Sequence, residues 1–575
     1  MNETTIRNIL RKTMLGKRLP QGSLLTIENR LRKKVGEESF YVFLADHRHE
    51  LFRDEDFAML YCSDNGRTSV PPSLLAVALL LQSFDRASDQ EATERAQFDQ
   101  RWQLALGVSE EEVPFAKSTL CLFRTQLILH KEAKLIFHKG IEYLRKQGFV
   151  KRHKIRLALD TTPIFGKGAV EDTFNMLAEG LRQVLRVLAE LTFQKPEEFA
   201  RLHDFGRYVQ PSFKGTWRMN WDNENERQTV LDSLVVDCER MLTIARLTLN
   251  DYPAESEQAN NILEASKLLG KLLAQDVHRT STGKAEIIDG VAPDRIVSVH
   301  DPEMRHGRKS ATQRFDGYKA SLSVVPESQV IADVDVLPAN AHDNTNAPAL
   351  VAESAKNLDV QIEGVLGDGA YGSVEARLDA QAGGYTLTAP VGQLPQHGRF
   401  TKDDFVIDLE NETVTCPAGQ VCSTWYEQRT KTKRGTTFRN KCFMFSVAQC
   451  SRCPLRSQCV RPDASRRTIS VHEYEKILQQ AKVFQRTDEY RTIYRQRVAV
   501  EHRIARLIRL GVRKARYFGS TRVLFQLAMA ATVANLTLIA GSQSSGVLFL
   551  LTLSLISIFG FVGLTRITYR QFSWV

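Results

Sequence analysis

Three carboxylates stand in sequence contexts that could support metal-dependent chemistry on phosphate. Asp160 ends the apolar run IRLALD, and Asp368 ends a second apolar run, VLGD, which is followed by GAYG. Glu501 lies within a strongly basic stretch, YRQRVAVEHRIARLIRLGVRKARYF. Divalent metals prefer oxygen ligands, and neighbouring cations suit a nucleic-acid backbone. The pattern predicts that Asp160, Asp368 and Glu501 bind two Mg²⁺ or Mn²⁺ ions and promote phosphoryl transfer.

Each of these acids is weak evidence alone. The chain has 67 Asp and Glu residues, and most such side chains in proteins are solvated surface charges. The apolar runs before Asp160 and Asp368 strengthen the case that these two residues bind metal, because an unpaired carboxylate beside buried strands is costly without a cation.

The spacing of Tyr494, Arg497 and Glu501 is i, i+3, i+7, which on one helix places all three on the same face. One interpretation is an ordinary Arg–Glu helix pair with a tyrosine above it. The functional interpretation is that Glu501 binds metal while Arg497 and Tyr494 contact phosphate.

The elements that must position these residues follow an α/β pattern. Strand signals that appear first in succession and then alternate with helices predict a mixed sheet with helices packed on its faces. The first strand is expected to begin near Ile155 and end at Asp160. A helical insertion is expected over about 172–285, a long helix over Lys476–Leu510 and a more apolar helix over Thr521–Ala540. The remaining predicted strands are Arg295–His300, Tyr318–Val325, Val330–Leu337, Ile362–Leu366 and Tyr385–Pro390.

Residues 1–150 read as an all-helical region. Val70–Ser73 (VPPS) is a plausible start for a helix over Leu74–Leu81, and Ser118 could cap another helix over Thr119–Leu129. Short helices in a basic context are compatible with a helix-turn-helix DNA reader, and equally with a plain helical bundle.

Six of the nine cysteines fall within residues 395–480. Cys450 and Cys453 form a Cys-x-x-Cys motif, and this spacing suits tetrahedral Zn²⁺. The predicted ligands of a structural zinc site are Cys416, Cys450, Cys453 and Cys459. Cys422 and Cys442 leave the ligand choice open, and free thiols or a redox pair are the alternatives. Cys62, Cys121 and Cys238 are expected to be packing residues.

Length, net charge and apolar segments indicate which partners and which cellular location to expect. A chain of 575 residues predicts two to four domains, and a net charge of +10 favours a polyanionic partner, with a solvated basic face as the alternative. The N-terminus has no apolar signal-peptide core, which predicts a cytoplasmic, nucleoid-associated protein. The uncharged run Val547–Leu564 is long enough to span a membrane. We favour a buried or poorly folded C-terminal tail over a membrane tether, because the run contains Ser, Thr and Gly.

Four motifs in combination resemble a DDE transposase of a bacterial insertion sequence: LALDTTP, DPEMRHGRKSATQRFDGYKASL, VLGDGAYG and the Tyr494, Arg497, Glu501 spacing. The resemblance covers about 152–540 and extends more loosely over the N-terminal region. It departs in one place: the basic residue that follows the Glu by two turns in many relatives is replaced by Ile508, with Arg509 beside it.

The resemblance implies a ribonuclease-H-like mixed sheet with helices on both faces, and Asp160, Asp368 and Glu501 as the catalytic triad. It also implies Arg305, Lys309 and Lys319 as DNA contacts near the site. The expected domains are a helical N-terminal domain (1–150) for binding DNA ends, a catalytic core (151–394 and 481–541), a Cys-rich insertion (395–480) and an apolar tail (542–575).

The function implied by the resemblance is cleavage at the ends of an insertion sequence and joining of the 3′-hydroxyl to target DNA. The expected partners are terminal inverted repeats, target DNA and further copies of the chain in a dimer or larger synaptic complex, with no small-molecule substrate. The alternative is a catalytically inactive, DNA-binding relative.

Overall fold

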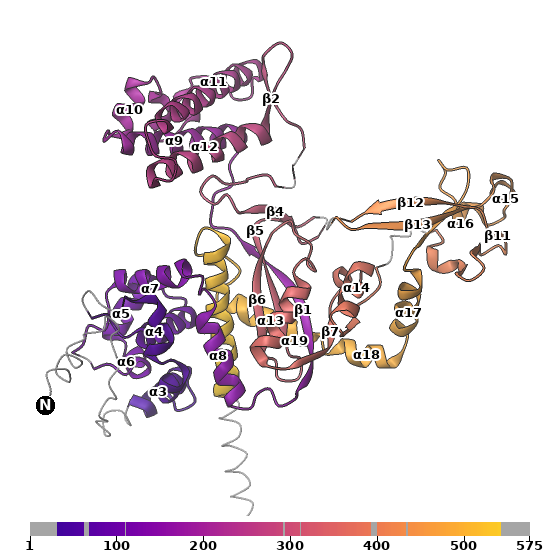
Figure 1. The fold of residues 1–575 in the computed structure, drawn as a ribbon, viewed down its shortest axis with the longest axis horizontal. Helices are drawn as coiled ribbons and strands as arrows, with labels where there is room; N and C mark the ends of the chain where they lie inside the picture. Colours follow the sequence, from indigo (N-terminus) through magenta and orange to yellow (C-terminus); the bar gives the residue numbers. More distant parts are fainter. Residues whose placement is uncertain are drawn as a thin grey trace, which may run out of the picture.

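A computed structural model of the chain describes residues 31–62, 68–109, 111–290, 292, 294–310, 312–392, 399–432 and 435–541. Figure 1 shows a central sheet with an N-terminal helical body on one side, a separate helical block beyond one end of the sheet, and a long arm on the other side. The apolar run Val547–Leu564 lies outside the described residues.

The central sheet is mixed and is consistent with a ribonuclease-H-like core. β1 is antiparallel to β5 and parallel to β7, β7 is parallel to β8, and β5 is antiparallel to β6 and β4. The order across the sheet is therefore β6-β5-β1-β7-β8, with β4 pairing with the first residues of β5. The bounds are β1 (Lys154–Phe165), β4 (Arg305–Arg308), β5 (Arg314–Val324), β6 (Ile331–Pro338), β7 (Gln361–Leu366) and β8 (Thr386–Thr388).

Helices from several parts of the chain flank this sheet. α13 (Ala347–Leu358) packs against β5, β6 and β7, α19 (Val498–Arg509) packs against β1 and β5, and α14 (Val374–Ala382) packs against β8. Together they enclose an apolar core that also receives side chains from the N-terminal helices.

Two strand predictions were wrong. β1 does not end at Asp160 but continues to Phe165, because β5 pairs with it along residues 158–165. The segment after α19 also bonds to the end of β1: the N–H of Phe165 donates to the carbonyl of Arg513, and the N–H of Ala515 donates to the carbonyl of Phe165. Residues 295–300 form no strand, although their apolar side chains are buried.

The N-terminal helical body shares its hydrophobic core with the sheet. α4 begins at Pro72, as the proline run predicted, whereas α7 begins at Lys117 with Ala116 at its N-cap, so Ser118 is not the cap. α8 also packs against α13. The described elements are α3 (Phe40–Leu51), a 3₁₀ helix (Asp54–Leu60), α4 (Pro72–Asp85), α5 (Asp89–Phe98), α6 (Gln100–Leu106), α7 (Lys117–Leu129) and α8 (Leu135–Lys146).

Between β1 and β4 the chain forms the separate helical block, which has its own apolar core. Side-chain oxygens of Asp172, Asn223 and Ser256 cap its three long helices. The elements of the block are α9 (Thr173–Leu191), α10 (Pro196–Leu202), α11 (Glu224–Leu249), α12 (Glu257–Asp276) and the hairpin of β2 (Val277–Arg279) and β3 (Ala285–Ile287).

The arm in Figure 1 follows β8 and holds six of the cysteines. It contains two small antiparallel sheets and returns to the core through α17 (Glu475–Gln485) and α18 (Asp488–Arg495). The elements of the arm are β9 (Val406–Asp408), β10 (Thr413–Thr415), β11 (Val421–Cys422), β12 (Trp425–Lys431), β13 (Thr437–Met444), α15 (Val447–Ser451), α16 (Arg456–Cys459) and β14 (Thr468–His472).

The C-terminal helix of the described chain, Ser520–Gly541, is long and apolar enough to cross a membrane by length and composition. Most of the apolar stretch of this helix (72%) is nevertheless buried inside the protein. The Asn535 side chain donates to the carbonyl of Ile331 and accepts from its N–H, both at 2.9 Å. The helix therefore packs as a core helix beside β6, and Figure 1 shows it alongside α8.

Candidate active site

The positions of Asp160 and Asp368 follow from the parallel pairing of β1 and β7. That pairing ends at Ala158 and Leu366, and each aspartate comes two residues later. Because both residues follow the last paired positions of two neighbouring strands, the two carboxylates lie near enough for the charge of Asp368 to raise the pKa of Asp160. Asp368 also caps the 3₁₀ turn Gly369–Tyr371, accepting a hydrogen bond of 2.9 Å from the N–H of Ala370.

Arg497 connects Asp160 with Glu501. Its Nη2 donates to Asp160 Oδ2 at 2.8 Å, and its Nη1 donates to Glu501 Oε1 at 2.6 Å. The carboxylates of Asp160 and Glu501 therefore bind the two terminal nitrogens of the same guanidinium group. Asp160 is mostly buried, whereas the Glu501 side chain is 55% exposed. Glu501 is thus the member of the three that is most open to solvent.

The helix that carries Glu501 is firmly anchored. Val500 and Leu507 of α19 are fully buried in the core, and Arg503, also buried, donates to the carbonyl of Ala534 in the C-terminal helix at 2.6 Å. Glu501 extends from the opposite, exposed side of α19 toward Arg497.

The long helix predicted over Lys476–Leu510 is interrupted, so that prediction was wrong. α17, α18 and α19 are separate, and Gln496 and Arg497 form the break between the last two. Around this break the backbone hydrogen bonds tighten to three-residue spacing, from Arg497 to Tyr494 and from Val500 to Arg497. Tyr494 and Glu501 therefore sit on different helices, with Arg497 at the junction between them.

The charges of the site act on one another. Burial, together with the nearby Asp368 and Asp343, raises the pKa of Asp160 to about 6, although Arg497 and the N–H of Thr161 work in the opposite direction. Burial also raises the pKa of Tyr494, and the carboxylates of Asp368, Asp160 and Glu501 add to that effect while Arg497 opposes it. The Tyr494 ring stacks on Tyr490, with centroids 5.3 Å apart.

Two residues that sequence reasoning did not select belong to this neighbourhood. Tyr371 is buried, its hydroxyl has no hydrogen-bond partner, and burial followed by the charges of Asp160, Asp343 and Asp368 holds its pKa well above the ordinary value. Asp343 accepts hydrogen bonds of 2.8 Å from Thr161 Oγ1 and from Lys319 Nζ. Tyr371 could have been found from its place in the GAYG motif, whereas Asp343 lies in a polar loop with no distinguishing pattern.

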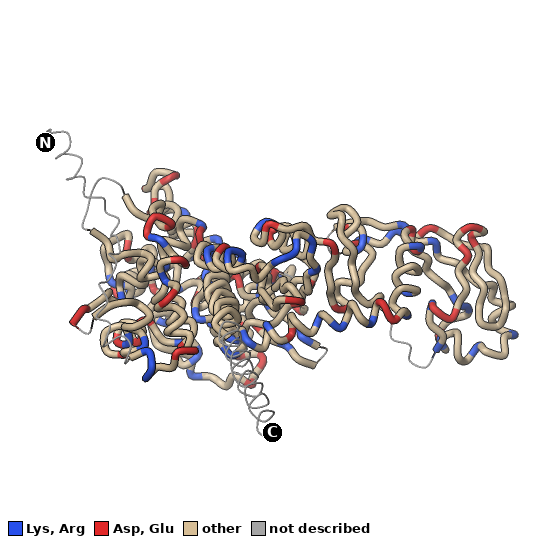
Figure 2. Tube along the Cα trace, turned by 90° about the horizontal axis from the view of Figure 1, so that it is seen from below, with Lys and Arg blue, Asp and Glu red and all other residues tan. Residues whose placement is uncertain are grey.

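The three basic residues expected to contact DNA occupy different settings. Lys319 is turned toward Asp343 and also donates to the carbonyl of Ala341. Arg305, on β4, donates to the carbonyls of Pro302 and Met304. Lys309 is exposed in the turn between β4 and β5. In the view of Figure 2, basic and acidic residues are interspersed along the part of the chain that the structure describes.

Carboxylate oxygens are the donors that Mg²⁺ prefers, so the chemistry of this set fits a divalent cation. Among the residues that the structure describes, however, no group of three or more His, Cys, Asp or Glu side chains is close enough to hold a metal ion. The Arg497 guanidinium lies between Asp160 and Glu501 and supplies the positive charge there.

The four cysteines predicted to bind zinc lie far along the arm. Cys416, Cys450, Cys453 and Cys459 line one small cavity, whereas Cys422 and Cys442 do not line it. All nine cysteines are free thiols.

Two protein-family models match parts of the chain. Residues 29–126 match a family described as Transposase domain (DUF772). Residues 415–540 match a family described as Transposase DDE domain, a range that includes Arg497 and Glu501 but neither Asp160 nor Asp368. A search of curated proteins finds no match.

Proposed function

We propose that this chain, an insertion-sequence DDE transposase as its two family matches support, cleaves the ends of its element and joins the freed 3′-hydroxyl to target DNA. The observation that carries the proposal is the Arg497 bridge between Asp160 and Glu501, next to Asp368. Carboxylates separated by more than 300 residues of sequence thereby share one polar site at the edge of the sheet.

Asp160, Asp368 and Glu501 are the residues that would hold two Mg²⁺ or Mn²⁺ ions. Burial and the nearby Asp368 disfavour the charged form of Asp160, and a divalent cation would offset both effects. Metal ions bound there would activate the attacking hydroxyl and stabilise the leaving oxygen of an in-line displacement. Glu501 is exposed enough to turn toward Asp160 when Arg497 releases it.

Arg497 has the shape and charge to exchange its carboxylate partners for a DNA phosphate. A guanidinium presents a planar fork of donors that suits carboxylate and phosphate oxygens alike. Its Nε is buried without a hydrogen-bond partner, so its present contacts do not use all of its donors. Tyr494, close to the same charges, would place its hydroxyl beside that phosphate.

DNA is the partner that the transposase families suggest, and Arg305 and Lys309 on the β4–β5 hairpin are proposed phosphate contacts. Lys319 is proposed as a third contact, which it can make after leaving Asp343. Binding should weaken with added salt, because phosphate contacts release counterions. Two element ends must be joined in one reaction, so we further propose a dimer or larger synaptic complex, testable by sedimentation of the protein–DNA complex.

The test is cleavage of a DNA fragment that carries an element end, with Mg²⁺, by wild type and by Asp160→Asn, Asp368→Asn and Glu501→Gln. Each substitution keeps the size of the side chain and removes its charge. We expect each variant to lose cleavage by at least about a hundredfold while still shifting the same fragment in a gel, because the changes remove metal ligands and leave the phosphate contacts.

Matched controls lie on the same elements. Glu363→Gln changes an exposed carboxylate of β7, and Glu489→Gln changes an exposed carboxylate of α18, so both should cleave like wild type. Full cleavage by Asp160→Asn would refute the assignment of this site. Wild-type binding to the end fragment without cleavage in Mg²⁺ or Mn²⁺ would favour the inactive DNA-binding relative, which no present observation favours.

A further inference from the structure

Four cysteines from separate turns of the arm line one cavity of about 20 Å³. This volume is close to that of one water-sized sphere. The four residues come from the turn after β10, from α15 and the turn that follows it, and from the end of α16: Cys416, Cys450, Cys453 and Cys459.

The backbone at two of these positions forms tight turns that begin with a cysteine. The N–H of Gly419 donates to the carbonyl of Cys416 at 2.8 Å, and Gly419 has a φ of +78°, which glycine adopts without strain. The N–H of Cys453 donates to the carbonyl of Cys450 at 3.4 Å.

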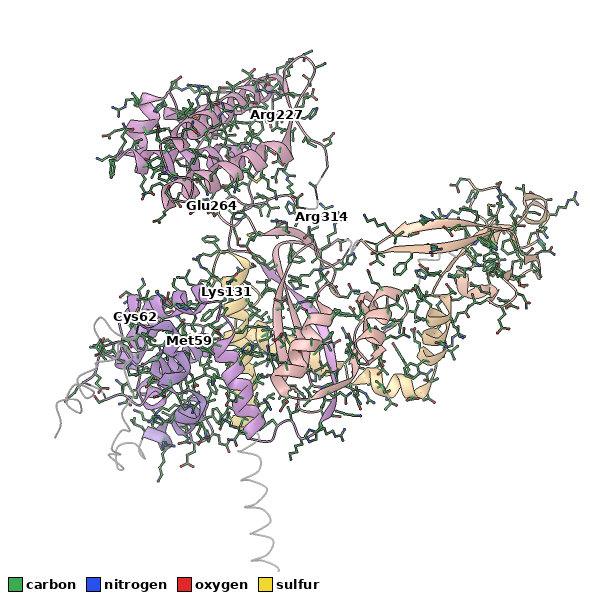
Figure 3. All side chains as sticks on the ribbon, in the orientation of Figure 1. Met59, Cys62, Lys131, Arg227, Glu264 and Arg314 are labelled. Atoms are coloured by element: carbon green, nitrogen blue, oxygen red, sulfur yellow. The ribbon has the colours of Figure 1, made fainter. Side chains whose placement is uncertain are left out.

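The other cysteines are engaged elsewhere. The Cys422 thiol donates to the carbonyl of Thr424 at 3.4 Å, and the Cys442 thiol donates to Gln428 Oε1 at 3.2 Å. Cys62 lies in the N-terminal helical body, on the far side of the molecule from the arm (Figure 3). The structure thereby separates four cysteines from the five others, a choice that spacing alone left open.

The charge around the cavity suits an anionic metal centre. A zinc ion with four thiolate ligands carries net negative charge, and the guanidiniums of Arg456 and Arg467 line the same cavity. Both are fixed by backbone carbonyls: Arg456 donates to Ser465 and Ala464, and Arg467 donates to Cys459 and Phe400. The Arg467 Nε is buried and has no partner.

The arm also has little else to stabilise it. Its apolar cluster contains nine buried residues, and two of these, Cys422 and Cys459, are cysteines. The strand β12 is exposed along its whole length. Small modules with so small a core are commonly held by a metal or by disulfides, and every cysteine here is a free thiol.

We propose that the arm binds one structural Zn²⁺ through four thiolates, those of Cys416, Cys450, Cys453 and Cys459. Among the described residues these thiols do not form a group that could hold a metal ion, so zinc binding requires them to move closer to one another. Each thiol releases its proton to solvent as its Zn–S bond forms. This zinc is separate from the proposed catalytic metals and stiffens the segment between β8 and α17, which leads back to Glu501.

The test uses the full-length chain, purified under reducing conditions and reconstituted with Zn²⁺ alone. Metal content measured by mass spectrometry should be about one zinc per chain in wild type. Cys453→Ser should bind less than about a tenth of that amount, because four-coordinate structural sites lose affinity steeply with one ligand. Cys442→Ser, a change on β13 outside the cavity, is the matched control and should keep its zinc.

A second measurement needs no variant. Co²⁺ added to the metal-free wild-type chain should give thiolate-to-cobalt charge-transfer absorption and the visible bands of tetrahedral coordination, and Zn²⁺ should abolish both. Failure of wild type to bind zinc and to give these bands would overturn the proposal. Equal zinc loss in Cys442→Ser and Cys453→Ser would overturn the ligand assignment. Glu501→Gln should retain zinc, so the result is independent of whether the chain cleaves DNA.

Discussion

Arg497 donates a hydrogen bond of 2.8 Å to Asp160, a residue 337 positions earlier in the chain. The same guanidinium holds Glu501, so one cation joins β1 to the junction of α18 and α19. This contact offsets the charge of a buried carboxylate. In the proposed function, a phosphate that draws Arg497 away would free both carboxylates for metal, so phosphate binding and metal binding would favour each other.

Replacing Asp160 by asparagine should stabilise the protein at neutral pH. The pKa of Asp160 is raised from 3.8 to about 6, so between these values the folded protein binds this proton more tightly than the unfolded chain. The stabilisation that comes from protonating Asp160 in the folded protein is therefore fully present below about pH 4, and it is lost as pH rises through about 6. The asparagine amide does not ionise, so the variant loses no stability as pH rises through this range. The amide oxygen can still accept a hydrogen bond from Arg497.

We expect Asp160→Asn to raise the free energy of unfolding by about 2–3 kcal/mol at pH 8, from about two pKa units, and by much less at pH 4. Urea denaturation of the two proteins at both pH values measures the difference. Glu363→Gln, an exposed carboxylate, should show no comparable pH-dependent gain. An equal effect of Asp160→Asn at both pH values would contradict the raised pKa of Asp160.

Gly372→Ala should displace the turn that orients Asp368. A Cβ at Gly372 would lie 1.8 Å from the carbonyl oxygen of Pro390, whereas a Cβ at Gly369 would meet nothing within 4 Å. Overpacking of this kind costs about 1–3 kcal/mol, and a shifted catalytic carboxylate should lower DNA cleavage by about tenfold or more. Gly369→Ala, in the same turn, is the control, and cleavage rates that fall equally in both variants would argue against a steric cause.

Arg124→Ala should destabilise the contact between the N-terminal helices and the core. Arg124 is buried, pairs with Asp89 at 2.7 Å and donates to the hydroxyl of Tyr517 at 2.6 Å. Removing one partner of such a pair costs about 3–5 kcal/mol. Thermal unfolding should show the loss, and Lys117→Ala, an exposed change on the same helix, should not. A variant with wild-type thermal stability and weakened DNA binding would instead indicate a DNA-contacting role.

Asn535→Ala tests whether the apolar C-terminal helix belongs to the folded core. The substitution leaves the N–H and carbonyl of Ile331 without their present partner, at a cost of about 2–3 kcal/mol. Urea denaturation should detect this loss, while Arg522→Ala, exposed on the same helix, should be close to neutral. If the helix left the core to enter a membrane, Asn535→Ala would leave the stability of the remaining protein unchanged.

Local pattern predicted several elements well. The proline run before Leu74 does begin a helix, and the apolar stretch near Thr521–Ala540 is a helix of the predicted length. Both depend on interactions within a few residues of sequence. The end of β1 could not be predicted in this way, because β5 and the segment around Arg513 extend it past Asp160 through pairing with distant chain.

The helix break at Arg497 is a second feature, within the candidate site, that local sequence pattern did not predict. Spacing predicted that Tyr494, Arg497 and Glu501 share one helix face, and the structure places them on two helices with Arg497 at the junction. Asp343 could not be predicted, because it lies in a polar loop and only the folded sheet brings it near Asp160, whereas Tyr371 has a sequence signal in the GAYG motif.

The sequence by itself determined which residue types are available: acids that follow apolar runs, an arginine four residues before a glutamate, and a Cys-x-x-Cys with further cysteines on either side. Those features are local, and short-range spacing is enough to read them. The tertiary structure alone decided that Arg497 pairs with both Asp160 and Glu501, and that four of the nine cysteines line one cavity. Such contacts join segments tens to hundreds of residues apart, and their geometry is set by strand register and helix packing rather than by any periodicity along the chain.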